Sequence, residues 1–345
     1  MSTVKKLSFL GLLLIFVIFG ISVCSGAPIA SGSSYSINLA QYQTIPETNY
    51  YRNAEYFKKR VAELSDGRIT VNHFPGDLLG GWEIQSSHVK EGSLDMCLMS
   101  ISATFDPETE VFRMPYLVFS WEGAKKVFGP DGGGAKLLSE MCERNNTHSL
   151  GFDPTGFIVV ICKEKLTPLP GDESIKKLKT RVLSSKLEEM IGRTFGFSTL
   201  SLPFGEVNSA LMLGTIDAAM GPTYEEAPLF KDTIKYQYNY DYGFAGGPWI
   251  INGDLWKSLP AEDQEIFETA AREAIDDSWG MSISNQEKVV AEMREAGVQV
   301  VDLTKEQMAA NVRAIRDTVW SWAAKNLFSE ELMNKIKSFA QPVID

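Results

Sequence analysis

Residues 50–96, YYRNAEYFKKRVAELSDGRITVNHFPGDLLGGWEIQSSHVKEGSLDM, contain the alternation that decides the fold. Their first part carries an apolar residue every three or four positions, the spacing of an amphipathic helix, and a glycine ends it. RITVNHF (68–74) is predicted to be a strand, GWEIQSSHVKEG (81–92) a short helix and SLDMCLMS (93–100) another strand. A further strand is predicted before them, at SYSINLAQYQ (34–43). The order β-α-β-α-β predicts a parallel sheet with helices on its faces.

The alternation starts again after about residue 150. TGFIVVIC (155–162) is a continuous apolar run, as in a strand buried within a sheet, and LKTRV (178–182) is predicted to be a second strand. SSKLEEMIGRTFG (184–196) is predicted to be a helix that begins with a capping box of Ser185 and Glu188 and ends at a glycine. A second α/β unit therefore follows the first, and it continues over STLSLP (198–203), GEVNSALML (205–213) and TIDAAMG (215–221).

The C-terminal part is predicted to be mainly helical. Aromatic residues surround a Gly-Gly-Pro kink in YNYDYGFAGGPWIIN (238–252), and a strand follows the kink. Residues 258–297 keep helical spacing for nearly forty positions, which exceeds a typical globular helix, so this helix either spans two domains or breaks near Gly280. Residues 305–340 are further amphipathic helix. Two α/β units followed by helices predict two lobes with a cleft between them.

The N-terminus is predicted to be a secretory signal peptide of about residues 1–30 that is removed from the mature chain. Two lysines precede an apolar run at 9–23, which is short for a membrane span. Cleavage is expected between Val23 and Ser31. The alternatives are an uncleaved anchor and a lipoprotein at Cys24, although ISVC is a poor lipobox because Val23 stands where Gly or Ala is expected. The mature protein is therefore expected in the periplasm.

The composition, with 44% hydrophobic and 22% charged residues, is that of an ordinary soluble globular protein, and 345 residues suffice for about two domains. The net charge of −11, or −13 without Lys5 and Lys6, argues against a nucleic acid partner, because such binding depends on Lys and Arg contacts to phosphates. An anionic ligand would require a local cation that outweighs this overall field.

Besides Cys24, the chain contains Cys97, Cys142 and Cys162, an odd number that excludes a full disulfide framework. Either Cys142 and Cys162 form one bridge, or all three are buried small apolar side chains.

Patterns for catalysis, cofactors or metals are absent from the sequence. It has no G-x-S-x-G, Walker A or G-x-G-x-x-G motif. The three histidines, His73, His88 and His148, lack metal-ligand spacing. The carboxylate-rich PTYEEAP (222–228) is predicted to be a solvated loop or a helix start. We therefore do not expect an enzyme, a metal site or a cofactor.

Five segments, in order, resemble the solute-binding proteins of tripartite ATP-independent periplasmic (TRAP) transporters, the DctP family. Residues 50–96 contain the amphipathic helix and the G-R/K-I-x-V, P-x-x-x-L-G and G-S-L-D patterns of that family. EVFRMPYLV (110–118) is similar to its F-x-x-P-Y/F segment. LKTRV (178–182) and PFGEVNSALMLGTIDA (203–218) are similar to its K-x-R and E-V-x-x-A-L-x-x-G-x-x-D signature, and LWKSLPAEDQEIFETAAREA (255–274) to the start of its long helix.

The resemblance implies an α/β, two-lobed periplasmic binding protein fold with a central cleft, hinge strands and a long helix spanning both lobes. It places lobe one at about residues 33–155 plus 246–286, and lobe two at 156–245 plus 287–345. The partners that it implies are an organic acid ligand and the small and large TRAP membrane subunits. We expect the binding protein itself to be a monomer.

Arg181 is the residue expected to bind the ligand. It lies near the carboxyl end of a strand, where α/β sheets bind ligands, and shortly before Ser185 caps a helix. A guanidinium binds a carboxylate through two parallel hydrogen bonds, and the resemblance assigns this role to the arginine of the K-x-R strand. The alternative from the residues alone is a surface ion pair with Glu188 or another acid.

Three departures from the family pattern indicate a pocket less polar than one for a dicarboxylate or a sugar acid. TGFIVVICKEK (155–165) lacks the second arginine of many members, so Arg181 is expected to carry the ligand's charge nearly alone. Met220 and Gly221 replace an acidic or amide residue, and Ser100 stands where some members have an acid. Ser100 and Gly221 are expected at the site together with Tyr42, Gln43, Trp82, Phe157, Phe204, Trp249 and Asn252.

These residues predict an exported protein that captures an organic monocarboxylate with an apolar or aromatic body. Its carboxylate would pair with Arg181, and its body would pack on Phe204 and Trp249. For the aromatic residues the alternative is ordinary core packing, and Asn252 either binds the ligand or caps the following turn. At the level of function, the alternatives are a periplasmic sensor, an exported enzyme on the same fold, and a dicarboxylate or sugar-acid ligand.

Overall fold

The computed structural model describes residues 28–342, so the predicted signal peptide lies outside the described residues as far as Ala27. One lobe contains the parallel strands predicted from the first unit, because β1 pairs in parallel with β2 on one side and with β3 on the other. Tyr35 lies opposite Ile69, and Leu39 lies opposite Met96. The bounds are β1 Tyr35–Gln41, α1 Asn49–Leu64, β2 Ile69–Pro75, α2 Trp82–Glu91 and β3 Met96–Leu98.

The other lobe repeats this plan. β5 lies between β6 and β7 and pairs in parallel with both, so that Thr180 lies opposite Thr199 and Ala218. Helices α6 and α7 connect the strands, as the sequence predicts. The bounds are β5 Lys179–Val182, α6 Lys186–Phe195, β6 Ser198–Ser201, α7 Val207–Leu213 and β7 Ala218–Thr223.

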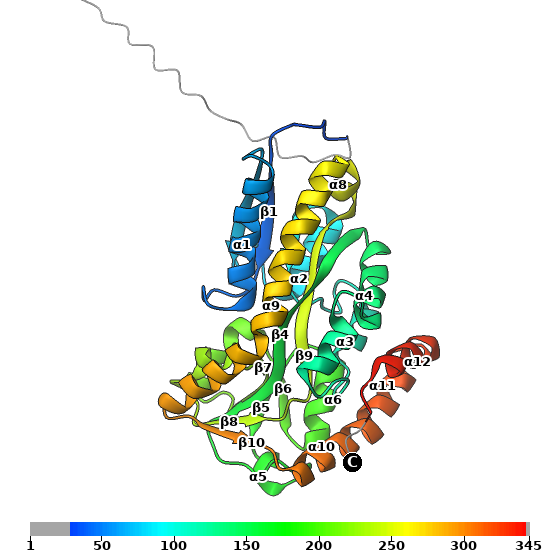
Figure 1. The fold of residues 1–345 in the computed structure, drawn as a ribbon. Helices are drawn as coiled ribbons and strands as arrows, with labels where there is room; N and C mark the ends of the chain where they lie inside the picture. Colours follow the sequence, from blue (N-terminus) through cyan, green and yellow to red (C-terminus); the bar gives the residue numbers. More distant parts are fainter. Residues whose placement is uncertain (1–27, 343–345) are drawn as a thin grey trace, which may run out of the picture.

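Two long strands, β4 (Thr147–Cys162) and β9 (Phe244–Asn252), join the two lobes. They pair antiparallel as far as Phe157, and β9 pairs with β3 on its other side. Beyond that point β4 pairs with β7 and with β8 (Tyr236–Asn239). In Figure 1 both strands run side by side through the middle of the molecule. The predicted hinge strands are therefore present, and they unite both lobes in one ten-stranded sheet.

Helix α9 (Ala261–Glu295) is continuous for 35 residues and runs along the length of the molecule (Figure 1). It packs against α1, where Tyr56 and Arg60 both donate hydrogen bonds to Glu273, and against β10 (Gln299–Asp302) of the other lobe. Gly280 does not break it, because a single exposed glycine costs a helix only about 1 kcal/mol. The helix spans both lobes, as the resemblance implies.

The C-terminal helices return from the second lobe to the first. α10 (Lys305–Ile315) packs on α6, whereas α12 (Glu330–Phe339) packs on α4 (Gly133–Glu143). Between them lie a π-helical turn (Arg316–Trp320) and α11 (Ser321–Asn326). Residues 287–345 were predicted to belong to lobe two, yet α12 contacts an element of lobe one. The division of the chain into lobes stays a prediction.

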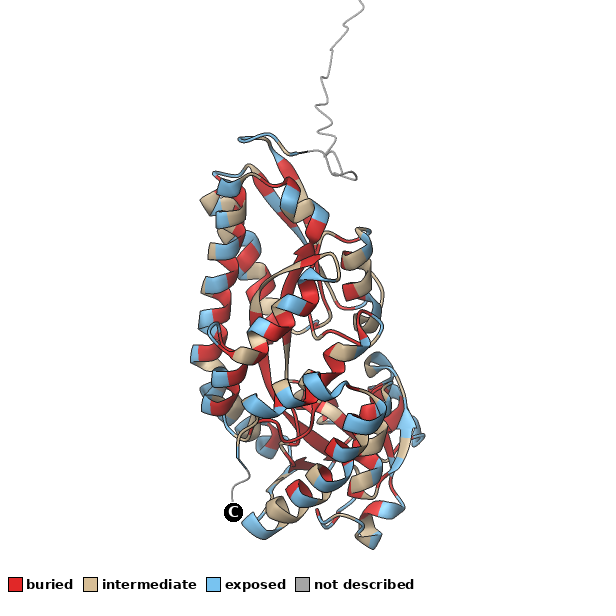
Figure 2. Cartoon of the chain, turned by 90° about the vertical axis from the view of Figure 1, so that its right-hand side faces the viewer, coloured by how far each residue is buried: buried red, intermediate tan, exposed pale blue. Residues whose placement is uncertain are grey.

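Helices cover the sheet with their buried faces and expose their outer faces (Figure 2). Within this core Cys97, Cys142 and Cys162 are buried and free, so the alternative of a bridge between Cys142 and Cys162 is wrong. The remaining bounds are η1 Pro107–Arg113, α3 Trp121–Phe128, α5 Glu173–Lys176, η2 Phe204–Glu206, η3 Ala227–Phe230 and α8 Gly253–Ser258.

Ser185 caps α6, but the predicted capping box is only half formed. The Ser185 hydroxyl accepts hydrogen bonds from the backbone N–H groups of Leu187 (3.1 Å) and Glu188 (3.4 Å). The Glu188 carboxylate does not return to the backbone of Ser185, whose N–H group donates to the Leu183 carbonyl. Glu188 instead accepts a hydrogen bond from Tyr242. The cap fixes where α6 begins and leaves Glu188 facing the interior.

Substitution Ser185→Ala is expected to lower the free energy of unfolding by about 1 kcal/mol, because two N–H groups at the start of α6 lose their acceptor. Ser185→Asp is the control, since aspartate caps helices as well as serine does. Urea unfolding followed by circular dichroism measures both. An alanine variant as stable as the wild type would show that the cap contributes nothing here.

Candidate functional site

Arg181 on β5 is the most deeply buried cation of the candidate site, with 1% of its surface exposed. Its Nε donates to the Leu202 carbonyl (2.8 Å) and its Nη1 to the Met220 carbonyl (3.1 Å). Its Nη2 is buried and has no hydrogen-bond partner within residues 28–342. Burial lowers the pKa of the guanidinium to about 10, so it remains charged at neutral pH. The alternative of a surface ion pair with Glu188 or another acid is therefore wrong.

The guanidinium of Arg181 occupies the space where a side chain at position 221 would lie, and this space is free because residue 221 is a glycine. A Cβ atom at position 221 would lie 2.8 Å from Arg181 Nη1 and 2.9 Å from a methyl group of Leu183. The backbone there has φ +111°, which residues with side chains rarely adopt. The departure from the family pattern at this position therefore has a steric consequence, because any side chain would compete with Arg181.

A pocket between the lobes opens onto Arg181 and contains about 420 Å³ of empty space, part of it open to solvent. Tyr42 and Ser100 follow β1 and β3 of one lobe, whereas Arg181 and Phe204 come from the other. The Phe204 ring lies 5.7 Å from the guanidinium carbon of Arg181. The structure thus brings together six of the ten predicted site residues: Arg181, Phe204, Tyr42, Trp82, Ser100 and Gly221.

The other four predicted residues lie elsewhere. Gln43 lines an adjoining pocket that shares Tyr42 with the first. Trp249 is fully buried, donates to Asp153 and packs on Phe57, so it belongs to the core.

Phe157 is also a core residue, packed edge-to-face against Trp121 and Phe244. Asn252 caps α8 by accepting hydrogen bonds from two backbone N–H groups, and its amide donates to the Val89 carbonyl. The structure gives both residues the alternative roles stated above, core packing and capping.

Arg113 at the end of η1 is a pocket residue that the sequence analysis missed. Its guanidinium carbon lies 5.4 Å from the centre of a Trp82 ring, and its Nη1 lies 3.7 Å from the Glu188 carboxylate. The pocket therefore holds a second cation beside Arg181, one that lies against a carboxylate of the protein. The sequence feature that could have identified Arg113 is its position directly before Met-Pro in EVFRMPYLV. Its distance from Arg181 along the chain gave no indication that the two share a pocket.

The PTYEEAP segment supplies two carboxylates that link the lobes, the buried Glu226 and the half-buried Glu225. It was predicted to be a solvated loop or a helix start, and η3 begins within it at Ala227. Glu226 accepts hydrogen bonds from the Tyr42 hydroxyl (2.8 Å) and from the Thr223 backbone (2.9 Å), and burial raises its pKa. Glu225 accepts from the backbone N–H of Asn49, the first residue of α1, at 2.5 Å. Its other oxygen is buried without a hydrogen-bond partner in the described part of the chain.

The solute-binding class follows from this arrangement. Two α/β lobes, joined by hinge strands and one long helix, enclose a pocket that holds a buried cation with an open hydrogen-bonding position. Within residues 28–342, no helix is both long and apolar enough to cross a membrane, and no cluster of three or more His, Cys, Asp or Glu residues is arranged to hold a metal ion.

The chain belongs to the family of bacterial extracellular solute-binding proteins, family 7 (DctP), whose model matches residues 40–326. A C4-dicarboxylate-binding periplasmic protein of Rhodobacter capsulatus is 27% identical over 77% of this chain and 80% of its own length. An ectoine-binding periplasmic protein of Halomonas elongata is 26% identical over 74% and 76%. A TRAP periplasmic solute-binding protein from Sulfurospirillum deleyianum, crystallised with succinate, has a TM-score of 0.79 at 24% identity and covers 89% of this chain and 99% of its own.

Substitution Gly221→Ala is expected to weaken ligand binding at least tenfold, because the added Cβ displaces the Arg181 guanidinium. Gly214→Ala is the control, since Gly214 also has positive φ (+73°) but nothing lies within 4 Å of its Cβ position. Isothermal titration of both variants measures the difference. Equal losses in both would mean that backbone strain, and not the displacement of Arg181, lowers the affinity.

Substitution Glu225→Gln is expected to stabilise the protein increasingly as the pH rises from about 5 to 8. Burial raises the pKa of Glu225 from 4.5 to about 8, so folding takes up a proton in this window and the wild type loses stability as this carboxyl ionises. Glutamine keeps the oxygen that accepts from Asn49 and removes the ionisation.

Urea unfolding at several pH values measures this difference, and Glu330→Gln, at an exposed position, controls for the loss of one carboxylate. A stability difference between Glu225→Gln and the wild type that stays constant with pH would contradict the assignment.

Proposed function

We propose that this chain is the periplasmic solute-binding subunit of a TRAP transporter, which captures a small organic acid as a monomer and delivers it to the small and large membrane subunits. Membership of the family supports the transport role. The similar proteins differ in what they bind, since the one from Rhodobacter capsulatus binds C4-dicarboxylates and the one from Halomonas elongata binds ectoine. The ligand of this chain is therefore inferred from its own pocket.

The observation that carries the proposal is the unpaired Nη2 of Arg181. A buried N–H group without an acceptor costs about 1–3 kcal/mol, and more when it is charged. A ligand carboxylate would supply that acceptor and a countercharge in one contact. Within the described residues, no carboxylate of the protein lies within ion-pair distance of Arg181. A solute anion would give Nη2 the acceptor that the described residues do not provide.

A monocarboxylate fits the charge of the pocket better than a dicarboxylate. Arg113 already lies against the buried Glu188, whereas Arg181 is the cation that remains to be matched. Apolar wall positions beside it, Leu183, Phe204 and Ile158, favour a hydrocarbon body. The dicarboxylate is the second candidate, because a second carboxylate able to displace Glu188 would find Arg113 in the same pocket.

Substitution Arg181→Ala is expected to reduce affinity for the bound acid at least tenfold while the protein stays folded. Arg181→Lys keeps the charge but lacks the paired donors of a guanidinium. Its affinity for the acid should therefore fall between that of the wild type and that of Arg181→Ala. A thermal-shift screen of organic acids identifies the ligand, since a ligand at 100 times its Kd stabilises the protein by about 2.7 kcal/mol.

Arg193→Ala, on the exposed face of α6, is the matched control for removing an arginine. Circular dichroism verifies that each variant is folded. If the acid binds Arg181→Ala as tightly as it binds the wild type, then Arg181 does not hold the ligand and the proposed site is wrong.

A further inference from the structure

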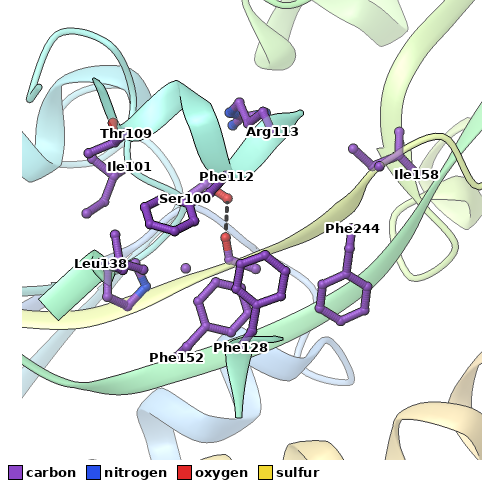
Figure 3. Close-up of a pocket in the computed structure, with 14 residues that line it drawn as sticks. Ser100, Ile101, Thr109, Phe112, Arg113, Phe128, Leu138, Phe152, Ile158 and Phe244 are labelled. Atoms are coloured by element: carbon purple, nitrogen blue, oxygen red, sulfur yellow. Dashed lines mark hydrogen bonds between the residues drawn. The ribbon is translucent and has the colours of Figure 1, made fainter. Parts of the chain in front are cut away.

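A second chamber adjoins the Arg181 pocket and shares Ser100, Arg113 and Ile158 with it. It contains about 520 Å³ of empty space, including the part that opens outward. Figure 3 shows its walls, with Phe112 and Arg113 facing a group of phenyl rings across the space near Ser100. The apolar side chains that line this phenylalanine chamber are Phe112, Phe128, Phe152, Phe244, Ile101 and Leu138.

The phenyl rings of this chamber form a stacked wall. Phe128 stacks on Phe152 (4.8 Å between centroids) and on Phe244 (5.8 Å). The Gly-Gly-Pro kink of β9 permits this packing, because a Cβ atom on Gly246 would lie 2.5 Å from the Phe152 ring. The aromatic crowding around that kink is therefore a property of the chamber wall as well as of the core.

The polar groups of the chamber are already engaged. The Ser100 hydroxyl donates to the Gly246 carbonyl (2.8 Å), and the Thr109 hydroxyl donates to the Asp106 carbonyl (2.6 Å). Arg113 is the charged residue among those that line the chamber, and it lies against Trp82 and Glu188. A ligand group entering here would meet hydrocarbon on most sides and few free donors or acceptors. The chamber favours an apolar group over a hydroxylated one.

We propose that the phenylalanine chamber is the subsite for the hydrocarbon body of the ligand and that its walls set the length of acid that binds. This inference rests on the proposed function, because it takes Arg181 as the carboxylate site. The ligand extends from Arg181 past Arg113 into the chamber. The ligand body then packs on Phe112 and Ile101, which replaces the predicted packing on Trp249, a core residue.

The test is calorimetric titration of the full mature chain with acetate, butyrate, hexanoate and octanoate. Each methylene group that enters the chamber should increase affinity about fourfold, which corresponds to about 0.8 kcal/mol per buried methylene. The gain should end when the chamber is full. Adipate has the same number of carbon atoms as hexanoate but carries a second carboxylate, so it should bind more weakly than hexanoate.

Two variants change the size of the chamber in opposite directions. Ile101→Phe fills it and should lower hexanoate affinity at least tenfold while changing acetate affinity less than twofold. Phe112→Leu enlarges it and should raise octanoate affinity relative to hexanoate. Ile283→Phe, at an exposed position on α9, is the matched control and should change neither. Should Ile101→Phe fail to fold, Phe112→Leu tests the inference alone.

The outcomes separate this inference from the proposed function. If affinity does not depend on chain length, or if adipate binds more tightly than hexanoate, the chamber is not a hydrocarbon subsite. Arg181→Ala is measured in the same series. If Arg181 is still required in that case, the proposed function stands and only the chamber assignment fails. If none of the acids binds and no other organic acid does, the proposed function itself fails.

Discussion

The burial of one guanidinium group constrains the structure around it. A charged group removed from water must be matched by hydrogen bonds, yet two backbone carbonyls and the Phe204 ring match Arg181 only in part. Leu202 directly follows β6 and Met220 lies in β7, and both of these strands pair with β5, which carries Arg181. The parallel sheet therefore holds the guanidinium rigidly and leaves one nitrogen for a ligand.

The connection between the lobes explains how such a site opens and closes. Strands β4 and β9 are shared by both lobes, so a bend in them changes the cleft without breaking either core. Contacts across the cleft include three polar ones, Tyr42 with Glu226, Asn49 with Glu225 and Arg113 with Glu188, and an edge-to-face contact between the rings of Tyr42 and Phe204. We infer that a bound anion tips the balance toward closure through its contacts with both lobes.

Local patterns predicted the units of the fold but not every residue that meets in the pocket. Periodicity and the capping serine located the strands, the helices and Arg181, because these features depend on residues near one another in the chain. The presence of Arg113 in the pocket could not be predicted, because Arg113 and Arg181 line the same pocket only once the two lobes pack together.

Aromatic residues and acids were misjudged for related reasons. The local sequence around Trp249 and Phe157 would be the same whether these residues pack in the core or line a pocket. The sequence therefore could not distinguish between these two roles. The sequence around Glu225 and Glu226 has the pattern of a solvated loop. Their partners, Tyr42 and the N-terminus of α1, come from the opposite lobe and are far away in the sequence.

The pairing of Arg113 with Glu188 bears most directly on which acids fit. A second carboxylate on a ligand would have to compete with Glu188, the acid that already lies beside Arg113. Displacing Glu188 would leave it buried without the cation at 3.7 Å. Leaving a buried charge without its partner costs several kcal/mol, more than a loosely placed ligand carboxylate regains. Under the proposed function, we infer that Glu188 would act against dicarboxylates, whereas Arg181, which has no carboxylate of the described residues within ion-pair distance, would accept the single charge of the ligand.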